Sequence, residues 1–207
     1  MLSKAKKIFF TGIGGIGISA LARLLRASGK RISGSDIAES EVTEALRQEG
    51  IPVTIGHRQE NLPADIELLI YSPAVPPENP ERAKAHKLGI SELSYPQALG
   101  QFASNKKVIA VAGTNGKTTT TAMIAWVLEQ AGLDPSAVVG SQVLAWNSNA
   151  RAGKGEYLVL EADEYRRAFL NYEPDIGVIT NIEPDHLDYF NDLEDVKSAF
   201  GEFVGKI

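Results

Sequence analysis

Short apolar runs alternate with amphipathic segments along the first part of the chain. Residues 7–11 form an apolar run that leads directly into glycines, and apolar side chains then recur at helical spacing until Gly29. The alternation continues with an expected helix at 42–49 and expected strands at 31–35, 53–55 and 67–71. Strands that alternate with helices predict a parallel sheet covered on both faces.

A proline-rich stretch separates this pattern from a second one. Four prolines between residues 73 and 80 predict irregular backbone, because proline lacks an N–H and fixes its own φ angle. A helix is expected at 81–88, and the polar segment 101–107 is typical of a domain boundary. We therefore expect two domains, at residues 1–103 and 104–207.

The second pattern begins with an expected strand at 108–112, a glycine loop, and a helix that Gly132 ends. The apolar face expected for this helix comprises Met123, Ile124, Val127, Leu128 and Ala131. Expected strands at 157–160 and 176–180 each lead into polar residues. The pattern predicts two consecutive α/β units, of which the second is incomplete.

Composition and charge narrow the function. The formal net charge of −5 argues against a protein that binds nucleic acid or an anionic membrane, since both need a basic surface. The absence of cysteine excludes disulfides and thiolate sites and agrees with a cytoplasmic location. The basic, then apolar N-terminus superficially resembles a secretory signal, but Arg23 and Arg26 interrupt the apolar part.

The first glycine loop follows the expected strand at 7–11 and opens a helix. Its glycines fit the pattern G-x-G-x-x-G, which lets backbone approach a diphosphate at a helix N-terminus, and they are Gly12, Gly14, Gly15 and Gly17. Asp36 ends the second strand, where an acidic side chain meets a ribose hydroxyl in dinucleotide sites. The pattern leaves open a dinucleotide, another diphosphate ligand or purely structural glycines, with Asp36 as a capping residue.

The second glycine loop has more specific chemistry. Lys117 is placed to reach the β- and γ-phosphates of a nucleotide, and the Thr118 hydroxyl is placed to bind Mg²⁺. Val111 stands where the general phosphate-loop pattern has its first glycine, so the loop is a shortened variant, and a structural turn is the alternative. The nucleotide-binding segment predicted here comprises Gly113, Thr114, Asn115, Gly116, Lys117, Thr118 and Thr119.

Two polar segments after later strands carry candidate metal ligands. Mg²⁺ prefers hard oxygen ligands, and Glu161 is the first polar residue after the strand at 157–160. We interpret Asp163 and Glu164 as turn or surface residues. His186 follows the next strand among carboxylates that could orient its ring, which makes it a second candidate, with a structural histidine as the alternative.

These motifs occur together in the Mur ligases, ATP-dependent enzymes that join an amino acid to a UDP-sugar precursor of the bacterial cell wall. The chain resembles that family along nearly all of its length, through residues 12–20, 33–36, 55–57, 71–75, 161–164 and 169–188. The resemblance implies an α/β fold with a Rossmann-like parallel-sheet N-terminal domain, followed by an incomplete P-loop-type domain that binds ATP.

The resemblance also implies roles for single residues. Lys117 would bind ATP phosphates, Thr118 and Glu161 one Mg²⁺, and His186 a second. The residues implied at the UDP-sugar are Gly14, Gly15 and Gly17 at the diphosphate, Asp36 and His57 at the uridine, and Ser72 in the crevice, together with Gly12 of the same loop.

Within the family, the resemblance favours the branch that joins L-alanine to UDP-N-acetylmuramate. Phe200 falls near the position where several siblings have a carbamylated lysine, which supports that branch. Asn115 stands where the branch more often has histidine, and Tyr165 is similar to the ligase that recycles murein tripeptide, although the insertion expected after it is missing. The family's third, C-terminal domain lies outside these 207 residues.

Three alternatives remain open at the level of the sequence. A sibling ligase could add another amino acid or a recycled murein peptide. A nicotinamide-dependent oxidoreductase would explain the first loop but leaves the second loop and Glu161 unexplained. A non-catalytic nucleotide-binding module would use the same loops, since fold and motif do not by themselves establish catalysis. The oligomeric state is not predicted.

Overall fold

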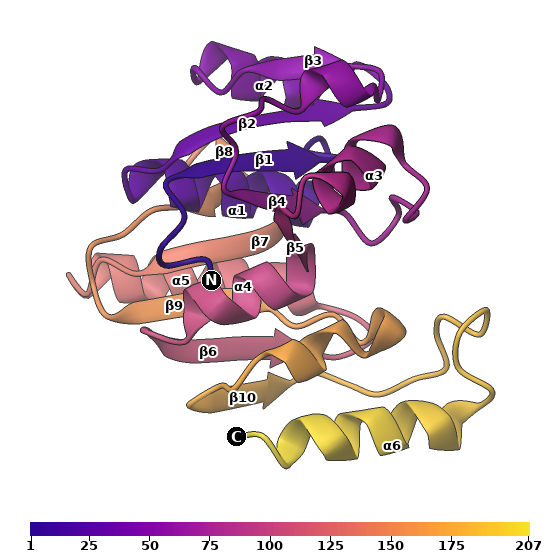
Figure 1. The fold of residues 1–207 in the computed structure, drawn as a ribbon. Helices are drawn as coiled ribbons and strands as arrows, with labels where there is room; N and C mark the ends of the chain where they lie inside the picture. Colours follow the sequence, from indigo (N-terminus) through magenta and orange to yellow (C-terminus); the bar gives the residue numbers. More distant parts are fainter. The chain divides into compact units, whose positions relative to one another are not determined.

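The computed structural model describes all residues from 1 to 207, which form two compact units, Met1–Gln101 and Phe102–Ile207 (Figure 1). The elements of the first unit are β1 (Lys7–Thr11), α1 (Ile16–Ala27), β2 (Arg31–Asp36), α2 (Glu41–Gln48), β3 (Val53–Ile55), η1 (Gln59–Asn61), β4 (Leu68–Tyr71), α3 (Pro80–Lys87), β5 (Ser91–Ser94) and α4 (Tyr95–Ala103). None of the helices in the chain is both long enough and apolar enough to cross a membrane.

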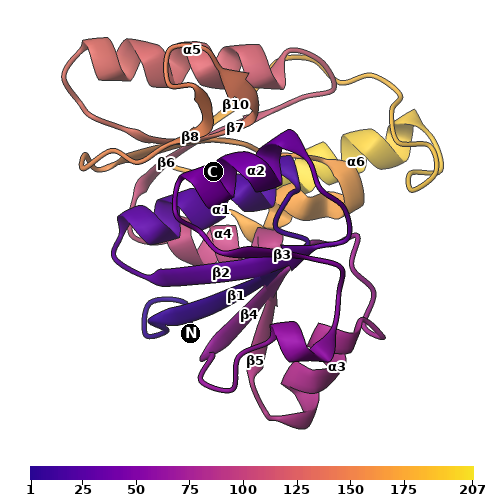
Figure 2. The same cartoon turned by 90° about the horizontal axis from the view of Figure 1, so that it is seen from above.

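The first unit contains a five-stranded sheet in the order β3-β2-β1-β4-β5, and every neighbouring pair is parallel. This arrangement confirms the expected parallel sheet. Figure 2 shows α1 and α2 on one face of the sheet and α3 on the other. The central strand β1 is buried from Ile8 onward, as a strand covered on both faces should be. All five strands therefore end at the same edge, and the loops that follow them carry the candidate residues.

Local sequence explains where the helices of this unit begin. Ser40 caps α2, because its side chain accepts a hydrogen bond from the Thr43 N–H while the Thr43 hydroxyl accepts from the Ser40 N–H. Asn79 caps α3, because its side chain accepts from the N–H groups of Glu81 and Arg82, and Pro80 occupies the first helical position, where its missing N–H costs nothing. The proline-rich stretch thus ends in a defined helix start. Neither β5 nor α4 was expected from the sequence pattern.

The second unit contains a five-stranded sheet in the order β10-β6-β9-β7-β8. Its elements are β6 (Lys107–Ala112), α5 (Lys117–Gln130), β7 (Ser136–Val143), β8 (Ser148–Arg151), β9 (Tyr157–Glu161), η2 (Tyr165–Asn171), β10 (Ile176–Ile179) and α6 (Leu193–Val204). Neighbouring strands are parallel except for β7 and β8, which form an antiparallel pair. The connection between β7 and β8 is short, which permits a hairpin but no crossover, and this explains why the pair is antiparallel.

The face that α5 turns toward the sheet differs from the expected one. Thr121 and Ala125 are buried, whereas the side chains of Met123 and Val127 are each 62% exposed. Successive helical residues are rotated by about 100°, so residues two positions from Ala125 point away from the sheet. Ile124 and Leu128 do contact the core, as expected. The small side chains at 121 and 125 decide the buried face, because they let the helix approach the strands closely.

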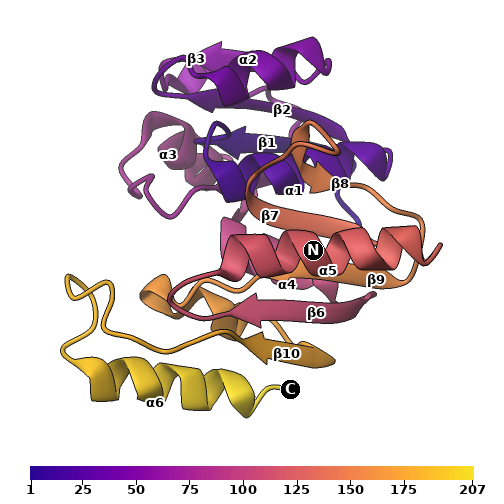
Figure 3. The same ribbon diagram turned by 180° about the vertical axis from the view of Figure 1, so that it is seen from behind.

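The helix α6 lies next to the edge strand β10 of the second sheet, as Figure 3 shows. Asp192 caps this helix by accepting a hydrogen bond from the Asp195 N–H. Phe203 stacks on Phe169 of η2 with ring centroids 4.8 Å apart, and Phe200 meets the same ring edge-on at 5.3 Å. This aromatic cluster fixes η2, the segment that directly follows the candidate acidic residues.

Candidate functional site

The phosphate-type loop of the second unit connects β6 to α5. Its geometry requires glycine at Gly113, where φ is +131° and a Cβ atom would lie 2.1 Å from the Thr180 hydroxyl. The loop is bound to the segment after β10, since the Thr114 N–H donates to the Asn181 carbonyl and the Asn115 N–H donates to the Asn181 side chain. The backbone N–H groups of Thr114 and Asn115 are therefore already used within the protein.

The N-terminus of α5 supplies the remaining N–H groups of the loop. Gly116 is the N-cap residue with φ of +82°, and no side chain caps the helix there. The first N–H groups of a helix have no partner within it, so those at residues 116–119 are available to an anion. Among the predicted nucleotide-binding residues, Gly116, Lys117, Thr118 and Thr119 are thus the ones whose N–H groups suit phosphate oxygens.

Lys117 is held in place by three partners. Its Nζ donates to the Gly113 carbonyl at 2.5 Å and the Thr114 carbonyl at 3.3 Å, and it forms an ion pair with Glu164 at 3.0 Å. The exposed fraction of the Glu164 side chain is 1%, and that of Lys117 is 17%. Interpreting Glu164 as a turn or surface residue was therefore wrong. The sequence alone does not distinguish it from the exposed Asp163 beside it, because only the fold shows which carboxylate points inward.

Glu161, at the end of β9, has an incompletely satisfied carboxylate. Its Oε1 atom is buried and has no hydrogen-bond partner. Burial raises the pKa of Glu161, opposed by hydrogen bonds from the Thr118 hydroxyl and the Gly140 N–H and by the charge of Lys117. A buried carboxylate oxygen without a donor, beside a threonine hydroxyl at a helix N-terminus, is the hard oxygen set that Mg²⁺ binds. Thr118 and Glu161 therefore fit the predicted metal.

Gly140 is a further residue next to Glu161, and sequence reasoning missed it. A Cβ atom at this position of β7 would lie 2.1 Å from Glu161 Oε2. Any side chain there would displace the carboxylate, so glycine is required for the close approach of the Gly140 N–H. An isolated glycine inside an apolar strand was the available sequence signal.

His186 lies on the same side of the second unit. Its Asp163 and Glu164 neighbours each place a carboxylate oxygen within 4.8 Å of a ring nitrogen. The Tyr165 ring packs against the imidazole at a centroid distance of 4.6 Å, and the Tyr165 hydroxyl donates to Asp188 at 2.9 Å. His186 itself has φ of +51°, a conformation that is uncommon outside glycine. The fold thus brings His186 to the carboxylates around Lys117.

The first glycine loop is arranged around Asp36. The Gly14 N–H donates to Asp36 Oδ2 at 2.7 Å, and the N–H groups of Gly12 and Ile13 both donate to the Ser35 carbonyl. A Cβ atom on Gly14 would lie 2.9 Å from Asp36 Oδ2. Gly14 therefore serves as a partner of Asp36, and its N–H is not free for a diphosphate in this structure.

The other residues predicted at the first loop divide into two groups. Gly12 has φ of +78°, and a Cβ atom there would lie 3.0 Å from that of Ser72, so the structure brings these two together. Gly15 is the N-cap of α1 and has no side-chain cap, which leaves the helix N-terminus open. Gly17 instead faces Tyr95 of α4, whose hydroxyl would lie 2.6 Å from an added Cβ. Its role is close helix packing.

His57 follows β3 at the same edge of the sheet. The Gly56 N–H donates to the Asp36 carbonyl at 2.7 Å, which places the start of this loop beside the end of β2. The imidazole Nδ1 lies 3.0 Å from the Ser35 hydroxyl and 3.4 Å from Glu81 Oε2. Ser35 and Glu81 are fully buried and were not predicted as site residues.

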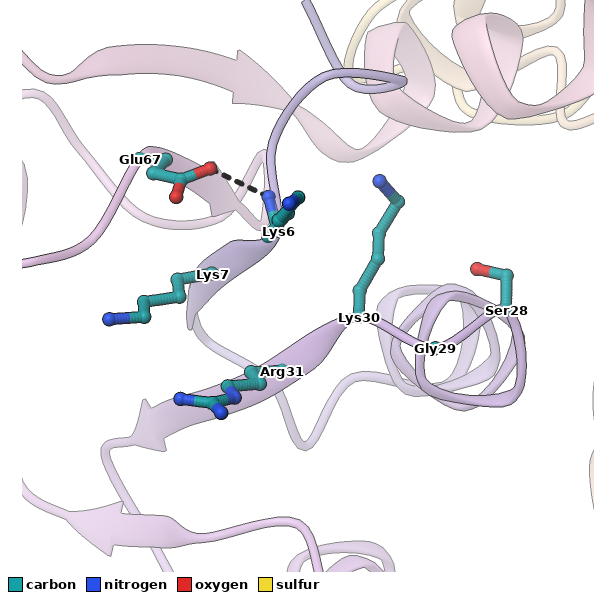
Figure 4. Close-up of a pocket in the computed structure, with 7 residues that line it drawn as sticks. All are labelled: Lys6, Lys7, Ser28, Gly29, Lys30, Arg31 and Glu67. Atoms are coloured by element: carbon teal, nitrogen blue, oxygen red, sulfur yellow. Dashed lines mark hydrogen bonds between the residues drawn. The ribbon is translucent and has the colours of Figure 1, made fainter.

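A basic pocket of about 500 Å³ lies at the opposite edge of the first sheet, where β1, β2 and β4 begin (Figure 4). Its lysines have structural partners: Lys7 pairs with Asp65, and Lys30 Nζ donates to the carbonyls of Leu2 and Ala5. Figure 4 shows Lys30 extended away from Lys7. Ligands of parallel α/β sheets bind outside the carboxyl ends of the strands, so this pocket is separate from the candidate site.

Comparison with known sequences agrees with both halves of the chain. The profile described as "Mur ligase family, catalytic domain" matches residues 7–107, and the profile described as "Mur ligase middle domain" matches residues 111–207. The chain belongs to the Mur ligase family. Both matches are consistent with the α/β fold and the two glycine loops described above.

Relatives within the Mur ligase family extend over nearly the whole chain. A UDP-N-acetylmuramate–L-alanine ligase of Carboxydothermus hydrogenoformans is 51% identical over 204 residues, which cover 99% of this chain and 44% of that protein. One of Aquifex aeolicus is 44% identical and is covered to 45%. The chain therefore spans less than half the length of these curated relatives.

Solved structures of Mur ligases show the same fold. The UDP-N-acetylmuramate–alanine ligase of Thermotoga maritima superposes with a TM-score of 0.90 at 36% identity, over 97% of this chain and 47% of that one. A UDP-N-acetylmuramate:L-alanyl-γ-D-glutamyl-meso-diaminopimelate ligase of Neisseria meningitides gives 0.88 at 30% identity, over 98% of this chain and 68% of that one. The chain is thus similar both to a ligase named for alanine and to a ligase named for the peptide L-alanyl-γ-D-glutamyl-meso-diaminopimelate.

Proposed function

We propose that this chain is part of an ATP-dependent, cytoplasmic ligase that joins L-alanine to UDP-N-acetylmuramate, with the first unit binding the UDP-sugar and the second binding ATP. The two curated relatives described above carry this activity in their names. One observation carries the proposal. Lys117, Thr118 and the unpartnered oxygen of Glu161 lie together at the open N-terminus of α5.

The proposed reaction has two steps. The carboxylate of UDP-N-acetylmuramate attacks the γ-phosphorus of ATP, which gives an acyl phosphate and ADP. The amino group of L-alanine then attacks the acyl carbon and loses a proton, the bond from that carbon to the phosphate oxygen breaks, and phosphate and the amide are formed. In the first step an anionic nucleophile approaches an anionic phosphate, so electrostatic stabilisation and in-line positioning are the main demands on the protein.

The residues of the second unit meet these demands in separate ways. The N–H groups at residues 116–119 hold phosphate oxygens, and Lys117 Nζ offsets the charge that develops during phosphoryl transfer. Thr118 and Glu161 would hold Mg²⁺, and His186 would hold a second ion. The bound metal supplies Lewis-acid stabilisation of the phosphoryl oxygens.

Lys117 has to be shared between Glu164 and the nucleotide. The Glu164 carboxylate compensates the charge of Lys117 and keeps its side chain over the loop. Phosphate oxygens of ATP offer Nζ an additional anionic partner at the same place. Glu164 thus orients Lys117 before the nucleotide arrives, which limits the side-chain ordering that binding requires.

For the UDP-sugar, the candidate contacts are at the carboxyl edge of the first sheet. Gly12, Gly15 and Ser72 surround the open N-terminus of α1, and Asp36 and His57 lie at the ends of the next strands. Because Asp36 accepts the Gly14 N–H, we assign Asp36 to hydroxyl groups of the ligand rather than to its diphosphate.

Ligand-dependent unfolding of the 207-residue chain tests this proposal directly. A ligand present at about 100 times its dissociation constant stabilises the native state by about 2.7 kcal/mol. We expect UDP-N-acetylmuramate to shift the unfolding of the first unit, Mg-ATP to shift that of the second, and NADH to shift neither. A shift with NADH alone would favour the oxidoreductase and contradict the proposal.

The variant Lys117→Met separates the two binding functions. It removes the ammonium and keeps the length of the side chain. The affinity for Mg-ATP should therefore fall at least tenfold, whereas the affinity for UDP-N-acetylmuramate should stay unchanged. The matched control in the same unit is Lys106→Met, which removes a cation whose Nζ donates to the Gly155 carbonyl. Loss of UDP-sugar binding in Lys117→Met would show that the two loops are assigned the wrong way round.

A further inference from the structure

A fully buried carboxylate lies in the first unit, close to the carboxyl edge of the sheet where we propose that the UDP-sugar binds. Glu81 occupies the first turn of α3 with an exposed fraction of 0%. Its Oε2 accepts a hydrogen bond from the Ser35 hydroxyl at 2.6 Å, and its Oε1 accepts from the Asn61 side chain at 2.7 Å. His57 Nδ1 lies 3.0 Å from the same hydroxyl and 3.4 Å from Oε2. These contacts define a cluster of Ser35, His57, Asn61 and Glu81.

The hydrogen atoms of the cluster are constrained by the Ser35 hydroxyl, which has only one. If Glu81 is ionised, Ser35 donates to it, and the contact with His57 requires that Nδ1 carries a proton. If Glu81 is protonated, it donates to Ser35, and Ser35 donates to an unprotonated Nδ1. The two arrangements differ by a proton shift through the hydroxyl, so Ser35 couples the protonation of Glu81 to that of His57.

No neighbouring cation takes the place of the proton that Glu81 and His57 share through Ser35. Asp36 of β2 adds negative charge, and Arg58, which follows His57, is exposed to solvent. Of the cations on α3, Lys84 donates to the carbonyls of Gln59 and Leu62, and Arg82 pairs with Glu92 of β5. None of these side chains forms a hydrogen bond or an ion pair with Glu81. A buried carboxylate without a counter-charge is costly, so Glu81 depends on Ser35, Asn61 and His57 for compensation.

The neutral cluster has one consequence for the ligand side of His57. With Glu81 ionised the imidazole is a cation, and with Glu81 protonated the imidazole is neutral with its proton on Nε2. In both cases Nε2 carries a hydrogen and is a donor. When the cluster loses one proton, Ser35 still donates to Glu81, Nδ1 keeps its hydrogen, and Nε2 becomes an acceptor.

We propose that Glu81, acting through Ser35, is a positioning residue that ties the polarity of His57 Nε2 to the protonation of the cluster, so that the neutral cluster presents Nε2 as a hydrogen-bond donor toward an acceptor oxygen of the bound nucleotide-sugar. Loss of one proton from the cluster reverses this polarity and weakens binding. The identity of the ligand rests on the proposed function, whereas the proton arrangement rests only on the contacts within the cluster. No hydrogen bond within the chain uses Nε2, which leaves it available to a ligand.

Nitrogen NMR of the imidazole rings tests the cluster without any ligand. The chain has three histidines, so the variant His57→Gln assigns the His57 signals, and His86 and His186 serve as internal references. In the wild-type chain, we expect Nε2 to lose its proton on raising the pH while Nδ1 keeps its own. The opposite tautomer, with the proton on Nε2 at high pH, would overturn the proposal whether or not any variant folds.

The variant Glu81→Gln tests the role of the charge. Its amide has nearly the same shape and donates to Ser35, so Ser35 donates to Nδ1 and the proton of the neutral ring stays on Nε2 at high pH. We expect His57 in this variant to show no change to the Nδ1–H tautomer. Glu78→Gln, on an exposed residue just before α3, is the matched control and should titrate like the wild type. Identical titration of Glu81→Gln and the wild type contradicts the proposal.

Binding of UDP-N-acetylmuramate, measured by calorimetry across pH, tests the consequence. Above the pH at which the cluster loses its proton, the wild-type affinity should fall about tenfold per pH unit, as linkage to one proton requires. The affinity of Glu81→Gln should stay level over the same range. A wild type that binds no UDP-N-acetylmuramate at any pH contradicts the proposed function, and the tautomers measured by NMR then still decide the proton arrangement. Parallel pH dependence in both proteins overturns the role of Glu81.

Discussion

The ion pair between Lys117 and Glu164 is best tested by a double-mutant cycle on the stability of the second unit. Lys117→Met leaves the Glu164 carboxylate, which is 1% exposed, without a counter-charge. Removing the cation of a buried ion pair, so that the carboxylate stays unpaired, costs about 3 kcal/mol. Glu164→Gln is milder, because Lys117 is 17% exposed and keeps two carbonyl partners. We expect about 1–2 kcal/mol for this change.

The double variant removes both charges, so its cost should be smaller than the sum of the two single costs by about 2 kcal/mol. Coupling of about 0.5–3 kcal/mol is typical of residues in direct contact. Differential scanning calorimetry suits the measurement, because 1 kcal/mol shifts the midpoint by about 4–8 °C in a unit of roughly this size. Single costs that add within about 0.5 kcal/mol would refute the reasoning. Glu173→Gln, on an exposed residue of the same unit, is the control and should leave the midpoint unchanged.

Two further predictions concern the second unit. Burial raises the pKa of Glu161, so the folded state binds this proton more tightly than the unfolded state does. As the pH rises from the unfolded pKa through the folded pKa, Glu161 therefore lowers the free energy of unfolding. Glu161→Gln should therefore raise the midpoint at neutral pH in the presence of a chelator and abolish stabilisation by Mg²⁺; a lower midpoint would contradict this. Phe203→Ala should cost about 3–5 kcal/mol by denaturant unfolding, since it removes a fully buried ring stacked on Phe169, whereas the half-exposed Val204→Ala should cost under about 0.5 kcal/mol. Equal effects of these two substitutions would show that the aromatic cluster does not stabilise η2.

Much of the architecture follows from the order of apolar runs and glycines. The strands β1, β6 and β9 are short apolar runs that end in glycine or acidic residues, and this pattern predicts both the strand and the edge at which the chemistry lies. The antiparallel pair β7 and β8 was missed, because its residues are more mixed in polarity; β7 lies between β9 and β8, and β8 pairs with β7 alone at the edge of the sheet. Partial burial of a strand is a property of its neighbours, which a local pattern does not contain.

The candidate site divides in the same way. The sequence by itself predicted Lys117, Thr118 and Glu161, because a glycine loop before a helix and a carboxylate after a strand have one physical use at the carboxyl edge of a parallel sheet. It did not distinguish Glu164 from Asp163, and it gave no reason to single out Ser35, Glu81 or Gly140.

Only the tertiary structure decided which of these groups are buried and what they contact. The Glu164 carboxylate meets Lys117 across 47 positions of sequence, and the Glu81 carboxylate meets the Ser35 hydroxyl across 46. The strength of a charge or a hydrogen bond depends on the solvent that surrounds it, and burial is set by chain segments distant in sequence. The sequence therefore determines which chemical groups are present, and the fold determines which of them lose water and must find a partner.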